Sequence, residues 1–284
     1  MIGACLAHAG ETVTLVVRPE TLKAHPPKLQ LDSTFGKWSV EVGWAASVPP
    51  ADILWLTVKA AQLDTALRSI TNASTITAIV PLLNGVEHVE WLRSKYGHDR
   101  VIPATIAGEF ERASIGHIIH RTPFARLNVS SLGRGLLHTT LNQLQGMGFT
   151  CNFVDDEATL MWSKLVFLAP IALTTTAFDK TIGEVVAGPE TWPQLQAGVC
   201  EACAAGQAEG ARVEADPVLQ MIKGLPPGMR SSMQKDVAQG RQPELDAIGG
   251  PIVRASKRHD LKASVTEALM AQIEHAGKAS RRAS

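Results

Sequence analysis

The sequence predicts an α/β fold in which a doubly wound parallel sheet is followed by an all-helical C-terminal domain. Three observations predict it. The 284 residues are enough for two domains, each with its own core. Strand-like and helix-like segments alternate through the first half, which is typical of a parallel sheet covered by helices. Beyond Asp156 the patterns are almost only helical, so we expect domains at residues 1–154 and 155–284.

The segments of the first half follow one another in a regular order. Residues 1–9 are helical in pattern, and Gly10 ends this helix. The nearly all-apolar run at residues 53–58 is typical of a strand buried on both faces. The other expected elements are strands at 12–17, near 29–31, near 39–42, at 75–83, at 101–107 and at 150–154, antiparallel edge strands within 116–129, and helices at 62–70, 86–94 and 136–146.

Three polar residues each come directly after an apolar strand. Arg18 follows the first strand, Lys59 follows the run at residues 53–58, and Asn84 follows the strand at 75–83. In a doubly wound sheet, ligands bind beyond the carboxyl ends of the strands. A single polar residue at such a place is ordinarily a loop residue, but three at one edge predict a binding site.

Lys164 is the one charge inside an apolar helical run that two acids open at Asp155 and Asp156. A lysine on an apolar face either extends its ammonium to water or meets a partner. The run is no membrane span, because its uninterrupted apolar part, residues 165–173, is too short and contains Pro170. The apolar neighbours that share the face of Lys164 at helical spacing are Leu160, Met161, Leu165, Leu168 and Ala172.

The composition excludes several classes of partner. The formal net charge of zero argues against nucleic acid and against an anionic membrane surface. No secretory signal opens the chain, so its four cysteines are expected to be reduced thiols in the cytoplasm. Cys200 and Cys203 have zinc-like spacing without a second pair, and His117 and His120 point to opposite faces of an extended segment. We therefore expect no metal site.

The order of these signals resembles the ketopantoate reductase family over nearly the whole chain. The residues that carry the resemblance are the arginine in VTLVVRP, the lysine in LTVKA, the asparagine and glycine in LLNGVE, the lysine in WSKL, and the late block SSMQKDVAQGRQPELD. The resemblance implies a Rossmann-type domain that binds NADPH. It also implies a helical domain like the C-terminal domain of 6-phosphogluconate dehydrogenase. The implied reaction reduces a 2-oxo acid such as 2-dehydropantoate, in the manner of pantothenate biosynthesis.

The resemblance also implies roles for single residues. Arg18 would bind the 2′-phosphate of NADPH, while Lys59 and Asn84 would line the cofactor cleft. Lys164 would be the general acid that protonates the ketone oxygen, with Glu244 close to it. Ser232 would hold the substrate. On the structural alternative, Ser232 is a helix N-cap and Glu244 is a solvated residue in the first turn of a helix.

This chain departs from the family at the substrate side. Family members carry asparagines four and eight residues beyond the lysine, where this sequence has Leu168 and Ala172. A further substrate asparagine position holds Ile182. An apolar pocket leaves polar groups of a substrate unpaired, at a cost of roughly 1–3 kcal/mol each. We therefore expect a less polar 2-oxo acid or ketone than ketopantoate.

A second departure concerns the start of the chain. The family opens with a strand and a glycine-rich turn that holds the pyrophosphate, whereas this sequence opens inside the following helix, at about Gly3. We therefore expect a first domain that is truncated at its N-terminus. Three functions remain open on this basis: an NADPH-dependent reductase that could form a homodimer, a non-catalytic remnant that dimerises or binds a small molecule, and a related NADP-dependent 3-hydroxy acid dehydrogenase.

Overall fold

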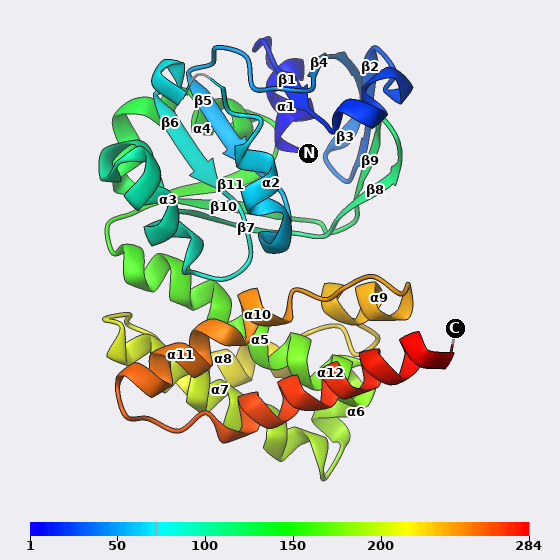
Figure 1. Cartoon of the computed structure of the whole chain (residues 1–284), viewed down its shortest axis with the longest axis vertical. Coiled ribbons are helices and arrows are strands. Elements are labelled where there is room, and N and C mark those ends of the chain that lie inside the picture. The colour runs from blue at the N-terminus through cyan, green and yellow to red at the C-terminus, as the bar shows by residue number, and fades with distance from the viewer. Residues whose placement is uncertain (72, 284) are drawn as a thin grey trace. The chain divides into compact units, whose positions relative to one another are not determined.

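The computed structural model describes residues 1–71 and 73–283, with side chains through Gly277. The chain divides into two compact units (Figure 1). The first contains Met1–Val58, Gln62–Leu83 and Val89–Asp155, and the second contains Lys59–Ala61, Asn84–His88 and Asp156–Ser284. Two short loops that interrupt the first unit along the chain, Lys59–Ala61 and Asn84–His88, therefore belong to the helical second unit.

The first unit has an α/β architecture. Its helices are α1 (Ile2–His8), α2 (Leu63–Leu67), α3 (His88–Tyr96) and α4 (Arg134–Gly146). Its strands are β1 (Thr14–Val16), β2 (Lys28–Ser33), β3 (Gly36–Glu41), β4 (Gly43–Ala45), β5 (Ile53–Leu56), β6 (Ala78–Pro81), β7 (Ala104–Ala107), β8 (Phe110–Ser114), β9 (His117–His120), β10 (Ala125–Ser130) and β11 (Phe149–Val154). The α/β class predicted for this half is confirmed, and all the expected elements are present with shifted ends.

The strands do not form the single parallel sheet that the alternation predicts. Among the described residues they pair in four sheets, with the orders β1-β4, β3-β2-β9-β8, β11-β10-β7 and β5-β6. The larger sheets are mixed: β2 is antiparallel to β3 and parallel to β9. Short turns at Gly36 and Gly116 reverse the chain between neighbouring strands, which makes those pairs antiparallel.

Two expectations about burial and edges are also wrong. The strand at residues 53–58 was expected to be buried on both faces, but in β5 only Leu56 is buried. Among the described residues β5 pairs with β6 alone, so it stands at a sheet edge, whereas β6 is buried throughout. The strands within 116–129 are not edges, because β9 lies between β2 and β8, and β10 lies between β7 and β11.

The core of the first unit forms between α1, α4 and the strands. Apolar side chains of α1 and α4, among them Leu6 and Leu137, are buried in the same cluster as those of β2 and β10, among them Leu31 and Leu127. Each of these segments contributes residues at the spacing of its own secondary structure, every second residue in β10 for example. The periodic apolar pattern read from the sequence is thus the pattern that builds the core.

The second unit is all-helical, as predicted, and its part beyond Asp155 is drawn from green to red in Figure 1. Its helices are α5 (Glu157–Phe178), α6 (Ile182–Ala187), α7 (Thr191–Ala208), α8 (Ala215–Lys223), α9 (Ser232–Ala238), α10 (Leu245–Ile248), α11 (Gly250–Arg258) and α12 (Ser264–Ala283). The buried apolar side chains of α5 and α7 form the centre of its core. This unit contains the lysine that the sequence singles out.

Helix α5 is the central helix of the second unit. The Asp156 carboxylate caps it by accepting the Thr159 backbone N–H at 3.0 Å. Pro170 lies inside the helix and faces Gly198 of α7. By length and composition α5 could cross a membrane, but 67% of its most apolar window is buried within the protein. It is therefore a core helix.

Candidate active site

Lys164 lies on α5 with its side chain half-buried, next to the buried residues Trp162 and Leu165. Burial lowers the pKa of Lys164 to about 8, and the nearby Glu244 carboxylate opposes that shift. Lys164 is therefore mostly protonated at neutral pH but releases its proton far more readily than an ordinary lysine. That is the titration behaviour of a proton donor matched to physiological pH.

Glu244 stands at the N-cap position of α10 and is half-buried. Its Oε1 accepts the backbone N–H of Ala60 at 3.0 Å, and its Oε2 accepts the side-chain amide of Asn84 at 3.0 Å. The alternative interpretation of Glu244 as a solvated acid is therefore wrong, because two loop donors bind its carboxylate. The hydrogen bonds hold a fixed negative charge close to the Lys164 ammonium.

The loop Asn84–His88 is fixed in place at its glycine. Gly85 adopts a φ of 87°, and a Cβ built on it would collide with the carbonyl oxygen of Ala247. Only glycine satisfies both conditions, the left-handed backbone and the close approach of α10. This explains why Asn84 is followed by glycine, and how the amide of Asn84 reaches Glu244.

Lys59 has a charged partner that the sequence did not predict. Its Nζ lies 2.6 Å from Oδ2 of Asp236 on α9, and Arg241 donates to the other carboxylate oxygen at 2.7 Å. Asp236 is only 8% exposed, so this carboxylate depends on its two cations. The available signal was local: Asp236 lies three residues after the apolar Met233 in a helical segment, on the face that becomes buried.

His88 is a second residue that sequence reasoning missed. It is the first residue of α3 and is 9% exposed, and its Nε2 has no hydrogen-bond partner among the described residues. Burial, and after it the charge of Lys164, lower the pKa of His88 to about 4. The imidazole is therefore neutral at physiological pH. The sequence feature that could have pointed to His88 was its position four residues after the predicted site residue Asn84.

Arg18 belongs to the first unit and precedes the short 3-10 helix Pro19–Ala24. Its side chain is exposed and forms no ion pair with a described residue. The other predicted residues all belong to the second unit, where the structure brings together Lys164, Glu244 and Asn84.

The residues expected on the substrate side have different environments. Ser232 is exposed in the first turn of α9, and the cap of that helix is Ser231, so the interpretation of Ser232 as the N-cap is wrong. Ser231 also accepts a hydrogen bond from Thr175 at 2.9 Å, which explains why it, and not its neighbour, faces inward. Leu168 is half-buried, whereas Ala172 and Ile182 lie inside the core.

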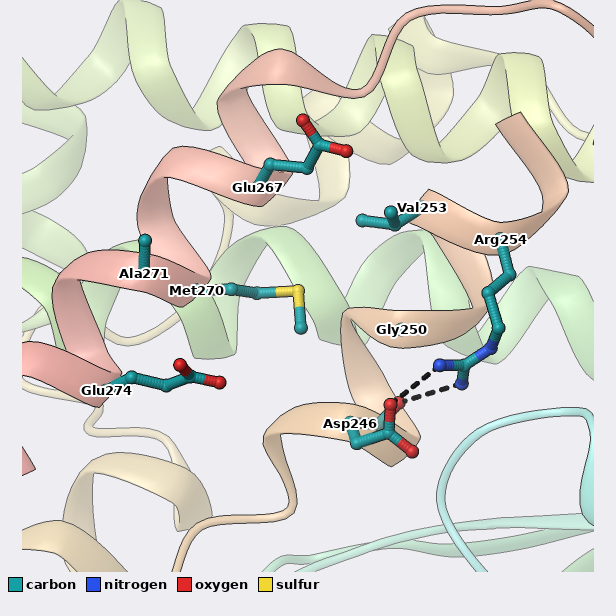
Figure 2. Close-up of a pocket in the computed structure, with 8 residues that line it drawn as sticks. All are labelled: Asp246, Gly250, Val253, Arg254, Glu267, Met270, Ala271 and Glu274. Carbon is teal, nitrogen blue, oxygen red and sulfur yellow. Dashed lines mark hydrogen bonds and ion pairs between the residues drawn. The ribbon is translucent and has the colours of Figure 1, made fainter. Parts of the chain in front are cut away.

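A hollow in the second unit lies away from these residues. Figure 2 shows an open groove of about 250 Å³ between α10, α11 and α12, lined in part by Asp246, Arg254, Glu267 and Glu274. Arg254 is already bound by Asp246 at 2.7 Å and by Glu87 at 2.6 Å. The groove contains none of the predicted site residues. No cluster of three potential metal ligands occurs in the described part of the chain.

Comparisons with known proteins match both halves of the chain to one family. The family model described as ketopantoate reductase PanE/ApbA matches residues 1–133, and its C-terminal counterpart matches residues 157–276. The first match begins at residue 1 and does not show the truncation that the sequence predicts.

Several curated proteins and solved structures are similar to this chain. A 2-dehydropantoate 2-reductase of Vibrio cholerae is 28% identical over 79% of this chain and 77% of its own length. The corresponding protein of Caulobacter vibrioides is 29% identical over 81% and 79%. A ketopantoate reductase structure from Ralstonia eutropha superposes with a TM-score of 0.87 at 23% identity, covering 99% of this chain and 95% of its own. A D-mandelate dehydrogenase with NADH and anilino(oxo)acetate gives a TM-score of 0.84 at 19% identity, over 98% and 94%.

Proposed function

The chain belongs to the ketopantoate reductase PanE/ApbA family, and we propose that it reduces a 2-oxo acid to the 2-hydroxy acid with NADPH. The observation that carries the proposal is the environment of Lys164. Its pKa is lowered to about 8 by burial, and a carboxylate fixed by two hydrogen bonds lies near it. A purely structural lysine at a helix edge needs neither feature.

The proposed chemistry divides between the cofactor and the chain. When bound, NADPH would supply a hydride for the carbonyl carbon. Lys164 gives its ammonium proton to the carbonyl oxygen, which becomes the hydroxyl of the product, and its neutral amine then regains a proton from solvent. Before that transfer, the positive charge of Lys164 stabilises the negative charge that grows on this oxygen. Glu244 raises the pKa of Lys164 and so keeps the donor protonated.

The side chains present fit the proposed cofactor. Arg18 carries an exposed guanidinium that forms no ion pair with a described residue, so its charge is available to a phosphate. Guanidinium groups bind phosphate oxygens in a bidentate manner, which supports Arg18 as the residue that holds the 2′-phosphate of NADPH. Lys59 and Asn84 would line the cofactor cleft, although Asp236 and Glu244 already bind their polar ends.

The substrate is proposed from the residues beyond Lys164. The named relatives act on 2-dehydropantoate, and this is the first candidate substrate. The apolar, half-buried side chain of Leu168 favours a second candidate, a 2-oxo acid with an apolar side chain, whereas Ala172 lies in the core. The likeness in fold to the D-mandelate dehydrogenase supports testing an aromatic 2-oxo acid as well. For each of these three candidates, Ser232 is the proposed contact for a polar group of the substrate.

Two further observations support a cell compartment and an oligomeric state for this chain. All four cysteines are free and three of them are buried, which supports a reducing compartment such as the cytoplasm. A related ketopantoate reductase from Staphylococcus aureus is dimeric, and we propose a homodimer for this chain.

The test is an assay of the whole chain with a panel of substrates. NADPH consumption is followed by absorbance with 2-dehydropantoate, 3-methyl-2-oxobutanoate and benzoylformate, with NADH in parallel, and the 2-hydroxy acid is identified by mass spectrometry. The proposal predicts turnover of at least one 2-oxo acid with a preference for NADPH. Oxidation of 3-hydroxy acids alone would support the related dehydrogenase instead. Binding without turnover of any substrate would support a non-catalytic protein.

A further inference from the structure

The starting point is an unpaired atom. Nε2 of His88 is fully buried and has no hydrogen-bond partner among the described residues, and the residue as a whole is 9% exposed. Buried polar atoms in folded proteins nearly always have a partner, so an exception requires an explanation. One common explanation is a group that binds a ligand and is satisfied only when that ligand is present.

His88 is not a histidine that merely completes the core. His120, which is 2% exposed, shows that alternative: its Nδ1 pairs with Ser33 at 2.9 Å and its Nε2 with Phe124 O at 3.0 Å. Both ring nitrogens of His120 are therefore satisfied by the protein. Nε2 of His88 is buried too, but it has no partner among the described residues.

The segment that carries His88 is held on three sides. Asn84 donates to Glu244, Gly85 abuts the backbone of α10, and Glu87 pairs with Arg254 at 2.6 Å. These contacts hold the chain that leads into His88. The same contacts fix it close enough to Lys164 for the ammonium charge to act on the imidazole.

We propose that His88 is a further substrate-binding residue, whose Nε2–H donates a hydrogen bond to a carboxylate oxygen of the 2-oxo acid bound beside Lys164. This inference rests on the proposed function and specifies which group recognises the acid. It also supplies a polar contact to the substrate, which the apolar side chain of Leu168 on the helix of Lys164 does not.

The protonation state of the ring suits this role. Burial and the charge of Lys164 keep His88 neutral, so the ring carries one N–H and can present it at Nε2. A neutral ring donates a hydrogen bond without placing a second positive charge next to Lys164, which would otherwise lower the pKa of the proton donor further. No proton leaves His88 during the reaction.

The test compares two buried histidines in the whole chain. His88→Leu removes the donor and keeps a similar volume, His88→Gln restores a side-chain N–H, and His120→Leu is the matched control. Each variant is measured for kcat and for KM with the best 2-oxo acid of the wild type, for KM with NADPH, and for Tm. The His120→Leu protein is assayed per folded molecule.

We expect His88→Leu to raise KM for the 2-oxo acid about 10- to 100-fold, which is the effect of losing a hydrogen bond to a charged group. KM for NADPH should stay within about twofold, and His88→Gln should recover part of the loss. Tm of His88→Leu should not fall, since the protein alone loses no hydrogen bond. His120→Leu should lower Tm and leave both KM values unchanged.

Two results would overturn the inference alone, and a third would overturn the proposed function as well. An unchanged KM for the 2-oxo acid in His88→Leu, with an active wild type, would remove His88 from substrate binding and leave the proposed function standing. A fall in Tm as large as that of His120→Leu would assign His88 to the core instead. A wild type that turns over no 2-oxo acid would overturn both the proposed function and this inference.

Discussion

The proton donor gives the most specific prediction at the scale of single residues. Lys164 has to carry its proton to act, and its pKa is about 8. We expect kcat for reduction to be constant well below pH 8 and to fall about tenfold per pH unit above it. Glu244 raises the pKa of Lys164, so in Glu244→Gln the fall should begin at lower pH. A pH profile of kcat for both proteins checks this, and identical profiles would contradict it.

The same titration has a consequence for stability. The pKa of Lys164 lies below the ordinary value of 10.5, so between about 8 and 10.5 the unfolded chain binds this proton more tightly than the folded chain. The contribution of Lys164 to the free energy of unfolding is therefore unfavourable below pH 8 and is relieved as pH rises through this window. This explains why a variant without the ammonium is not expected to be less stable.

Arg18 tests the choice of cofactor. Arg18→Ala removes a charge-assisted contact of roughly 1.5–3 kcal/mol to the 2′-phosphate, so most of the preference for NADPH over NADH should disappear. Use of NADH should barely change, because NADH lacks that phosphate. The ratio of kcat/KM for the two cofactors is the measurement, with Arg112→Ala, another exposed arginine of the same unit, as the control. An unchanged ratio in Arg18→Ala would exclude the role.

At the scale of elements, the loop Asn84–His88 depends on its glycine. Gly85→Ala forces a left-handed φ on alanine and drives a Cβ into the carbonyl of Ala247. Gly97 is the matched control, because its φ is 93° and a Cβ there meets nothing within 4 Å. We expect Gly97→Ala to lower the free energy of unfolding by about 1–3 kcal/mol through backbone strain alone. Gly85→Ala should lower it further, and urea denaturation that found equal losses would contradict this.

The two residues of helix α5 that the resemblance places on the substrate side, Leu168 and Ala172, differ in burial. Ala172 is fully buried in the core, so Ala172→Asn should cost about 2 kcal/mol or more and lower Tm markedly. Leu168 is half-buried, so Leu168→Asn should be tolerated. If Leu168 lines the site, this variant should favour 2-dehydropantoate over 3-methyl-2-oxobutanoate relative to the wild type. An unmoved ratio of kcat/KM would place Leu168 away from the substrate.

For the molecule as a whole, local patterns predict the elements better than the pairing between them. The helix around Lys164, the buried strand before Asn84 and the all-helical second half are each visible in a short stretch, because their apolar spacing is set by one element. Strand pairing depends on turns and on neighbours far along the chain. For this reason the single parallel sheet was predicted wrongly, and the larger sheets are mixed.

The site shows the same division. Sequence reasoning singled out Lys164, Asn84 and Glu244, and the structure brings these three into one unit. Sequence reasoning missed Asp236 and His88, because their significance depends on contacts with residues that lie far away along the chain. Lys59 and Asp236 are 177 residues apart, and no local pattern indicates that a buried acid would bind that lysine. The role of each of these residues in the reaction stays a prediction.

The turnover of Lys164→Ala is the direct test of Lys164 as the proton donor of a 2-oxo acid reductase. The measurement is kcat with NADPH and the best 2-oxo acid of the wild type, beside Lys262→Ala, an exposed lysine of the same unit, and with Tm recorded for all three proteins. We expect Lys164→Ala to lower kcat by about 10² to 10⁴ while Tm hardly falls, and Lys262→Ala to change neither. A Lys164→Ala protein that is less stable but fully active per folded molecule would contradict it.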